Sequence, residues 1–335
     1  MHAGRGGLAL KAFVTGATGF VGQHLCRSLV EEGWAVSALV RPGTAADELA
    51  DLPLEICRGD ITDLPSLYDA IPEVADAVFH VAASTNIWAK RNALQEAVNV
   101  GGTRNVIDAA IRARTRRFVH TSSFIIWGFH DAPVTEESPW LENANWINYV
   151  RTKRAAERLV KEAASTGDLD AVVMNPAHIL GPGDRHNWSR MIRMVHTGKL
   201  PGVPPGGGAF ADVREVARAH VAAFHRGRTG ANYLLGGHDL AYVDLVELIG
   251  EILGRPVPGR ASPAWVIRAI ARVKVLAAAL TGRAPDITPE GAALITRHIE
   301  CDSSRAVSEL GYGVTDPRRL LEDTCAWMRE VGLLA

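Results

Sequence analysis

A tyrosine and a lysine four residues apart carry the most specific chemical signal in the chain. Tyr149 and Lys153 lie in the run Tyr-Val-Arg-Thr-Lys, and in a helix this spacing places both side chains on one face. A nearby positive charge would lower the pKa of the phenol from about 10 towards the working pH, so that the tyrosine could donate or accept a proton. The pair therefore predicts general acid or base chemistry.

A serine at the end of an apolar run supplies a hydroxyl for the same chemistry. Ser123 closes the segment Thr121-Ser122-Ser123, where it could hold a carbonyl oxygen and the charge that develops on it. Taken singly, Ser123 would be a turn or capping residue. Together with the tyrosine and the lysine, it forms a site suited to reducing a carbonyl group or oxidising an alcohol.

Three glycines at a spacing of three point to a dinucleotide cofactor. Gly16, Gly19 and Gly22 follow an apolar run and open an amphipathic stretch, 23–32. Glycine allows the tight turn, the approach of a pyrophosphate to the backbone and close helix–strand packing, and the helix N–H groups hold the phosphates. The motif alone is weak, but its place between the first strand and a helix predicts a nicotinamide dinucleotide.

The end of the second expected strand favours NADP over NAD. Residues 33–46 contain no acid that could hold a free ribose 2′-hydroxyl, and Arg41 directly follows the strand. A guanidinium there could pair with a 2′-phosphate and stack on adenine. The alternative is a solvated loop arginine in an arginine-rich protein. We therefore expect NADP, with NAD as the alternative cofactor.

Two further strand ends face the expected cofactor. Asp60 follows the third strand and could accept a hydrogen bond from the adenine amino group; equally, Asp60 or Asp63 could cap the next helix. The fourth strand ends in His80, followed by Val81-Ala82-Ala83, and small residues there let a dinucleotide lie flat across the strand ends. We interpret His80 as a packing histidine rather than a catalyst.

Apolar runs alternate with helical patterns along the chain, which indicates parallel strands joined by crossover helices in a doubly wound α/β sheet. After Pro176, clusters of proline and glycine change the texture of the sequence. We therefore expect a cofactor domain over 10–175 and a smaller substrate lobe over 176–335 that is interleaved with late returns to the main sheet. The expected strands are 12–15, 35–40, 54–57, 77–81, 117–121 and 171–174, and the longest early helices are 93–113 and 146–164.

The composition excludes several classes of partner. The chain has 335 residues with 36 basic against 37 acidic side chains, which gives no long-range attraction for nucleic acid. Its four cysteines have neither metal nor disulfide spacing and are typical of a reducing compartment, so we expect no metal site. The first nine residues lack an apolar signal-peptide region, which favours a cytoplasmic location.

The motifs stand in the order found in extended short-chain dehydrogenases/reductases, and the chain resembles that family over nearly its whole length. The resemblance implies a Rossmann-type fold and a catalytic triad of Ser123, Tyr149 and Lys153, with Asn99 organising a proton-relay water behind the lysine. It also implies a homodimer formed by helices 93–113 and 146–164. The segments that carry the resemblance are 15–22, 59–63, 99–103, 121–123, 149–153, 175–176 and 181–184.

The resemblance also assigns the cofactor contacts along these segments. Backbone groups of Pro176-Ala177-His178 would face the nicotinamide amide, and Lys153 would bind the ribose hydroxyls. The predicted cofactor-binding residues are Gly16, Thr18, Gly19, Phe20, Val21, Gly22, Arg41, Asp60, Ile61, Val81, Ala82, Ala83, Tyr149, Lys153, Pro176, Ala177 and His178.

One departure separates branches within the family. Sugar-nucleotide epimerases and dehydratases usually carry an Arg-Asp-Phe run in the substrate lobe, and the corresponding stretch here is Gly208-Ala209-Phe210. A diphosphate would need another cation, such as Arg185 or Arg190. The chain is instead similar to the dihydroflavonol reductase and cinnamoyl-CoA reductase branch, which reduces ketones or aldehydes with NADPH. The alternatives are an NAD-dependent sugar-nucleotide epimerase or dehydratase and a non-catalytic NADP-sensing protein.

Tryptophans and one apolar segment bear on the substrate, a small-molecule carbonyl compound with a bulky apolar or planar body. Five tryptophans fall in segments expected to border the substrate cleft, although each is individually more typical of core packing. The segment 264–280 is apolar with basic residues interspersed; it could lie on a membrane surface, but we favour a lid or packing helix. The tryptophans are Trp88, Trp127, Trp140, Trp146 and Trp188, and the predicted substrate contacts are Ser84, Asn86, Trp88, Trp127 and Trp188.

Overall fold

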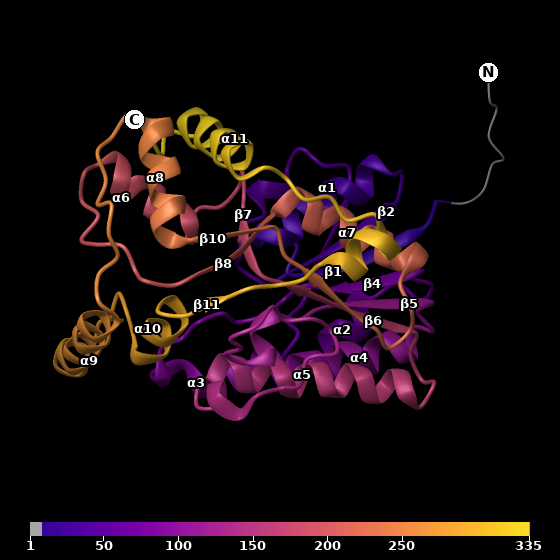
Figure 1. Ribbon diagram of the computed structural model, residues 1–335. Coiled ribbons are helices and arrows are strands. Elements are labelled where there is room, and N and C mark those ends of the chain that lie inside the picture. The colour runs from indigo at the N-terminus through magenta and orange to yellow at the C-terminus, as the bar shows by residue number, and fades with distance from the viewer. Residues whose placement is uncertain (1–8, 335) are drawn as a thin grey trace, which may run out of the picture.

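Seven parallel strands form the main sheet within residues 9–334, the part of the chain that the computed structural model describes (Figure 1). Their order, β3-β2-β1-β4-β5-β6-β9, reverses between β1 and β4. Ligands of such sheets bind outside the carboxyl ends of the strands at this reversal. The expected doubly wound sheet is therefore confirmed. Its strands are β1 (Lys11–Thr15), β2 (Ala35–Val40), β3 (Glu55–Arg58), β4 (Ala77–His80), β5 (Arg117–Thr121), β6 (Ala171–Pro176) and β9 (Asn232–Leu235).

Helices cover both faces of this sheet because successive strand residues point to opposite sides. Phe13 packs in the core beneath α2, α4 and α5, whereas its neighbour Val14 packs in the core beneath α1 and α7 (Figure 1). The first helix begins at Phe20 rather than at Gln23, because Gly19 already occupies the N-cap. The helices are α1 (Phe20–Glu31), α2 (Leu64–Ala70), α4 (Gly102–Arg112), α5 (Asn148–Ser165) and α7 (Val213–Arg226).

A second, smaller sheet lies beside the main one and is built around β8, which pairs with β7, β10 and β11. Residues after Pro176 contribute to both sheets, because β9 and α7 return to the main sheet. The smaller sheet consists of β7 (His178–Leu180), β8 (Gly207–Asp212), β10 (His238–Ala241) and β11 (His298–Ile299). The helices that accompany it are α6 (Trp188–His196), α8 (Tyr242–Leu253), α9 (Ala264–Thr281), α10 (Pro289–Ile295) and α11 (Pro317–Glu330).

The long helix expected over 93–113 is present and runs without a break over 92–112, but its helical type changes along the way. It consists of α3 (Asn92–Glu96), a π-helical turn over Ala97–Gly101 and then α4. A π-helical turn inserts one extra residue into a helix and is frequent at functional sites. The helix expected over 146–164 is present as α5. That these helices pair two copies of the chain stays a prediction.

No helix within residues 9–334 has both the length and the apolar character needed to cross a bilayer. The expectation drawn from the first nine residues concerns a segment of which residues 1–8 lie outside the described part of the chain. The apolar segment at 264–280 forms the helix α9 at the edge of the molecule (Figure 1).

Candidate active site

The turn between β1 and α1 can be built only with glycine. Gly16 has a φ of +70°, and a Cβ atom there would lie 2.7 Å from the backbone nitrogen of Ala82. A Cβ on Gly22 would lie 2.0 Å from the carbonyl oxygen of Gly16. The N-cap of α1 makes no side-chain hydrogen bond, and its first turn contains no acid. The backbone N–H groups of α1 are therefore suited to hold an anionic diphosphate.

The predicted catalytic side chains come together at the carboxyl end of β5. Ser123 follows this strand, and its side chain lies near enough to the phenol of Tyr149, at the start of α5, to lower the pKa of that phenol. One turn later on α5, the Lys153 ammonium donates a 2.7 Å hydrogen bond to the carbonyl oxygen of Thr121. The fold thus places a phenol, a hydroxyl and an ammonium within one small region, as the motifs predict.

Burial dominates the electrostatics of this group. It raises the pKa of Tyr149, and the neighbouring Ser123 side chain only partly opposes that rise. Without a bound nicotinamide, burial outweighs any effect of neighbouring positive charge on this pKa, and the lowering expected from Lys153 together with an oxidised nicotinamide stays a prediction. Burial lowers the pKa of Lys153 to about 8, with the Glu157 carboxylate acting in the opposite direction. The phenol is consequently a proton donor at neutral pH.

Glu157 is a residue that the sequence reasoning missed. Its side chain is fully buried one turn beyond Lys153 on α5. Its carboxylate accepts hydrogen bonds from the side-chain amides of Asn175 on β6, at 3.0 Å, and Asn232 on β9, at 2.7 Å. A buried carboxylate favours the charged form of a nearby ammonium. The spacing of four between Lys153 and Glu157 was a signal that could have identified it.

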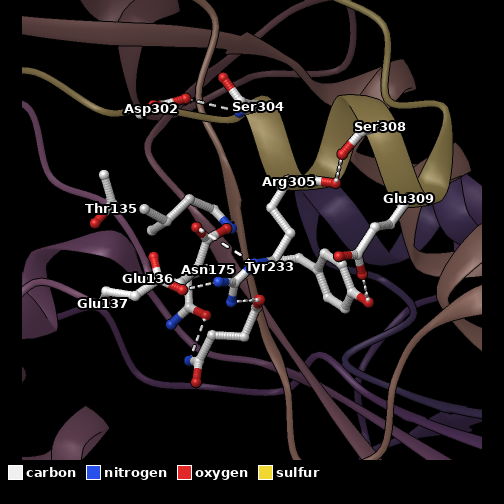
Figure 2. Close-up of polar contacts among 12 residues, drawn as sticks. Thr135, Glu136, Glu137, Asn175, Tyr233, Asp302, Ser304, Arg305, Ser308 and Glu309 are labelled. Carbon is white, nitrogen blue, oxygen red and sulfur yellow. Dashed lines mark hydrogen bonds and ion pairs between the residues drawn. The ribbon is translucent and has the colours of Figure 1, made fainter.

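A hydrogen-bonded network connects this inner carboxylate with the carboxyl-terminal part of the chain. Asn232 also donates to Asn175, at 2.8 Å. Arg305 donates to the carbonyl oxygen of Asn232 and forms ion pairs with Glu136 and Glu137, as Figure 2 shows. The segment around Arg305 therefore fastens β9, and with it the amides that hold the buried carboxylate.

Asn99 lies in the π-helical turn and supports the loop after β4. Its side-chain oxygen accepts a bond from Ser84 N at 2.7 Å, and its nitrogen donates to Ser84 O and to Thr152 Oγ1, both at 3.0 Å. Gln95 on α3 donates to the carbonyl oxygens of Ser84 and Asn86. Asn99 therefore positions a predicted substrate-binding segment beside α5, and its part in a water relay stays a prediction.

His80 belongs to a chain of hydrogen bonds rather than to the reacting group. Thr15 Oγ1 lies 2.8 Å from His80 Nδ1, and Thr103 Oγ1 lies 2.9 Å from Nε2. Because the Thr103 hydroxyl donates its hydrogen to Asn99 O, His80 Nε2 carries the ring hydrogen and donates to Thr103 Oγ1, whereas Nδ1 accepts a hydrogen bond from the Thr15 hydroxyl. Burial lowers the pKa of His80 to about 3. The interpretation of His80 as a packing histidine is confirmed. This series of hydrogen bonds also joins the glycine turn to the π-helical turn.

The adenosine end of the expected cofactor site contains two arginines. Arg41 is exposed after β2, as expected. Arg58 ends the neighbouring strand and donates to the carbonyl oxygens of Arg41 and Thr44. Arg58 was missed because sequence alone did not show that the ends of β2 and β3 are adjacent. The register of the two strands, in which Val40 lies opposite Arg58, shows that their ends are adjacent.

Asp60 lies in a local turn beside these arginines. Its Oδ1 accepts bonds from Thr62 N and Thr62 Oγ1 at 2.9 and 2.8 Å. Asp63 occupies the N-cap position of α2 but makes no side-chain capping bond. The capping alternative is therefore wrong for Asp63. The contact of Asp60 with adenine, like that of Ile61, stays a prediction.

The tryptophans separate into different environments. Trp127 is only 1% exposed and packs in a core cluster with Phe124 and Ile126, so the expectation that it borders an open cleft is wrong. Trp140 lies over two arginine side chains of α5 and Trp146 is exposed. The apolar rings of these tryptophans led to the prediction that they border the substrate cleft, but sequence alone could not distinguish a core position from a cleft position.

Trp188 and His178 meet in an aromatic cluster where the smaller sheet packs against α6 and α8. Their ring centroids are 5.3 Å apart, and Trp188 also packs against Phe210 and Tyr242. His178 in turn contacts Phe124, the residue after Ser123. Trp88 and Asn86 lie in the loop after β4, where Asn86 Oδ1 accepts a bond from Trp88 N. This polar atom therefore stabilises a turn of its own loop.

Comparison with known proteins agrees with this geometry. The sequence model of the NAD dependent epimerase/dehydratase family matches residues 12–236. The chain is 33% identical to "Putative dihydroflavonol 4-reductase" of Synechocystis sp., with 96% of this chain and 95% of that protein covered. It is also 33% identical to sterol demethylase protein B of Methylococcus capsulatus, with 97% and 100% covered.

A solved structure has the same fold as this chain. The protein titled gox2253 superimposes with a TM-score of 0.85 and 31% identity, covering 97% of this chain and 99% of that one. The glycine turn, the Ser123, Tyr149 and Lys153 group and the sequence matches agree. The chain belongs to the NAD-dependent epimerase/dehydratase family and is an NAD(P)-dependent enzyme of the extended short-chain dehydrogenase/reductase type.

Proposed function

We propose that the protein reduces a ketone or aldehyde on a bulky, largely apolar substrate with NADPH. The observation that carries this proposal is that Tyr149 lies one turn before the buried ammonium of Lys153 on α5, and that this ammonium is hydrogen-bonded to Thr121 O, two residues before Ser123. A bound nicotinamide would supply the hydride. The glycine turn fits such a cofactor, because the N-cap of α1 makes no side-chain hydrogen bond and its first turn holds no acid, so that its N–H groups can bind an anionic diphosphate.

The protein side chains then handle the substrate oxygen. Ser123 donates a hydrogen bond to the carbonyl oxygen and stabilises the charge that develops there. Tyr149 transfers its phenolic proton to the same oxygen as the carbonyl becomes an alcohol. Lys153 stabilises the phenolate that remains. Burial raises the pKa of Tyr149, so the phenol starts protonated, as reduction requires.

The preference for NADPH rests on the two arginines at the ends of β2 and β3. A 2′-phosphate could pair with the exposed guanidinium of Arg41, while Arg58 holds the loop that carries it through two carbonyl oxygens. No acid lies in residues 33–46 to favour the free 2′-hydroxyl of NAD.

The state of the arginines favours a carbonyl reductase over a sugar-nucleotide epimerase. Arg214, which follows the Gly208-Ala209 stretch by five residues, pairs with Asp212 and Asp323. Arg185 lies over the ring of Trp327, and Arg190 is 3.7 Å from Asp286. These side chains therefore make contacts of their own instead of presenting cations to a diphosphate. Aromatic rings around Trp188 offer apolar surface instead.

The test is a turnover panel with the purified protein. We expect NADPH oxidation with aromatic and alicyclic ketones or aldehydes, and kcat/KM should rise with ring size at roughly 0.8 kcal/mol per buried methylene. UDP-sugars should neither compete nor react. Micromolar competition by UDP, or epimerisation of a UDP-sugar, would favour the epimerase. Tight NADPH binding without turnover of any carbonyl would favour a sensing protein.

A further inference from the structure

The helix α9 presents an apolar face to solvent, in contrast to most helices of globular proteins. Its inner face packs on α10 through Ile267 and Ala271, and Ala278 on the same face is also buried. The large side chains on the opposite face are exposed, including Trp265 at 72%, Leu276 at 69% and Leu280 at 89%. A soluble helix normally directs polar residues outward, so this face lacks an explanation within the fold.

The apolar face is continuous. With 3.6 residues per turn, the outward residues fall within an arc of about 140° that contains no polar side chain. The apolar patch formed by this arc is larger than the patches that scattered apolar residues form on ordinary protein surfaces. The residues in the arc are Trp265, Val266, Ala269, Ile270, Val273, Leu276, Ala277 and Leu280.

Basic residues border this face. Arg268 and Arg272 lie along one edge, Lys274 lies along the other, and Arg283 follows the end of the helix. Residues 264–283 contain no acid. Lys274 is 3.4 Å from Asp286 and Arg268 donates to Thr296, so both side chains are directed along the flanks of the helix. An apolar stripe with cationic edges is the pattern of a helix that lies in a membrane interface.

The charges decide between the possible occupants. A second copy that paired through the same face would place these cations against their own equivalents, which opposes association. An anionic bilayer would complement the basic edges and cover the apolar arc. We therefore propose that α9 docks the protein on anionic membrane surfaces, with its axis in the plane of the interface.

The site of docking lies next to the substrate side of the enzyme. α10 carries α9, and the hydroxyl of Thr288, its N-cap, donates to the carbonyl oxygen of Ile87 at 3.0 Å. Ile87 belongs to the loop that also contains Ser84 and Asn86. The helix α9 lies at the edge of the molecule away from the main sheet (Figure 1), and docking through it would bring this loop toward the lipid, because Thr288 of α10 joins the two.

The test is co-sedimentation with vesicles of phosphatidylcholine containing phosphatidylglycerol, compared with phosphatidylcholine alone. The wild-type chain should bind the anionic vesicles, and added salt should weaken binding. Leu276→Asp/Leu280→Asp should reduce binding at least thirtyfold. Arg268→Gln/Arg272→Gln should reduce it about twentyfold on anionic vesicles only, at about fivefold per charge. Val74→Asp, at a site that is 68% exposed in the main domain, is the matched control.

Two further measurements keep the proposal falsifiable. Vesicles should shift the tryptophan emission of the wild-type chain to the blue, and Trp265→Phe should remove that shift. Failure of the wild-type chain to bind anionic vesicles would overturn the proposal. So would a dimer, seen by sedimentation velocity, that the Leu276→Asp/Leu280→Asp variant alone disrupts. None of these readouts depends on turnover, so they are separate from the test of the proposed function.

Discussion

Glu157→Gln should move the alkaline limb of catalysis towards neutral pH. The buried carboxylate opposes the burial that lowers the pKa of Lys153 to about 8, and the neutral amide cannot do so. Carbonyl reduction needs the ammonium form, so activity falls as pH rises through this pKa. Loss of one buried charge should displace the limb by roughly one pH unit, or about 1.4 kcal/mol. Rates at pH 8 should fall about fivefold, with little change at pH 6.

The assay is kcat/KM for NADPH-dependent reduction between pH 5.5 and 9.5, which reports the free enzyme. Gln at this position places an N–H group against the amides of Asn175 or Asn232, at a cost of about 1–3 kcal/mol in stability. Folding should therefore be checked at each pH. Glu162→Gln, an exposed change on the same helix, is the control, and Glu157→Asp should restore the limb. An unchanged limb in folded Glu157→Gln would refute the reasoning.

Three other changes test separate parts of the molecule. Tyr149→Phe should lower kcat by about 10² or more with cofactor affinity nearly unchanged; equal turnover would remove the phenol from the mechanism. Arg41→Ala should raise the Kd of NADPH by roughly tenfold or more and leave the Kd of NADH nearly unchanged. Arg58→Ala should weaken NADPH binding less than Arg41→Ala does. Calorimetric titration measures these constants, and equal effects on both cofactors would show that Arg41 does not bind the 2′-phosphate. The pKa of His220 is lowered to about 4 by burial, so the unfolded chain binds more protons below pH 6.5. Stability present above pH 6.5 is lost as pH falls towards 4, by up to about 3 kcal/mol for this group, and His220→Gln should flatten the urea-unfolding profile in that range.

The strands and the reacting group were predictable because each depends on local pattern. The runs at 35–40 and 117–121 are strands with the expected bounds, since buried parallel strands are apolar throughout. Tyr149 and Lys153 share a helical face by spacing alone. What could not be predicted depends on contacts between distant segments. Glu157 gains its role only when β9 returns to the sheet, more than seventy residues later.

The environment of a side chain, whether buried or exposed, was the other property that could not be predicted from the sequence. The pattern of α9 marks it as amphipathic, yet only the fold shows that the smaller inner stripe faces α10 and the larger apolar face is exposed. Trp127 illustrates the converse, because its ring is enclosed by core residues. The sign of the pKa change at Tyr149 likewise depends on burial, which no motif specifies.

The π-helical turn at Ala97–Gly101 has a consequence for chain length. One residue more or less in this segment would rotate α3 against α4 by about 100°. Gln95, before the turn, holds the carbonyl oxygens of the loop after β4, and Thr103, after it, holds His80. The extra residue therefore sets the rotation about the helix axis between Gln95 and Thr103, whose side chains must both point inward. A single-residue deletion here should therefore be more damaging than a substitution at those of the five positions whose side chains, unlike that of Asn99, do not hold the loop after β4.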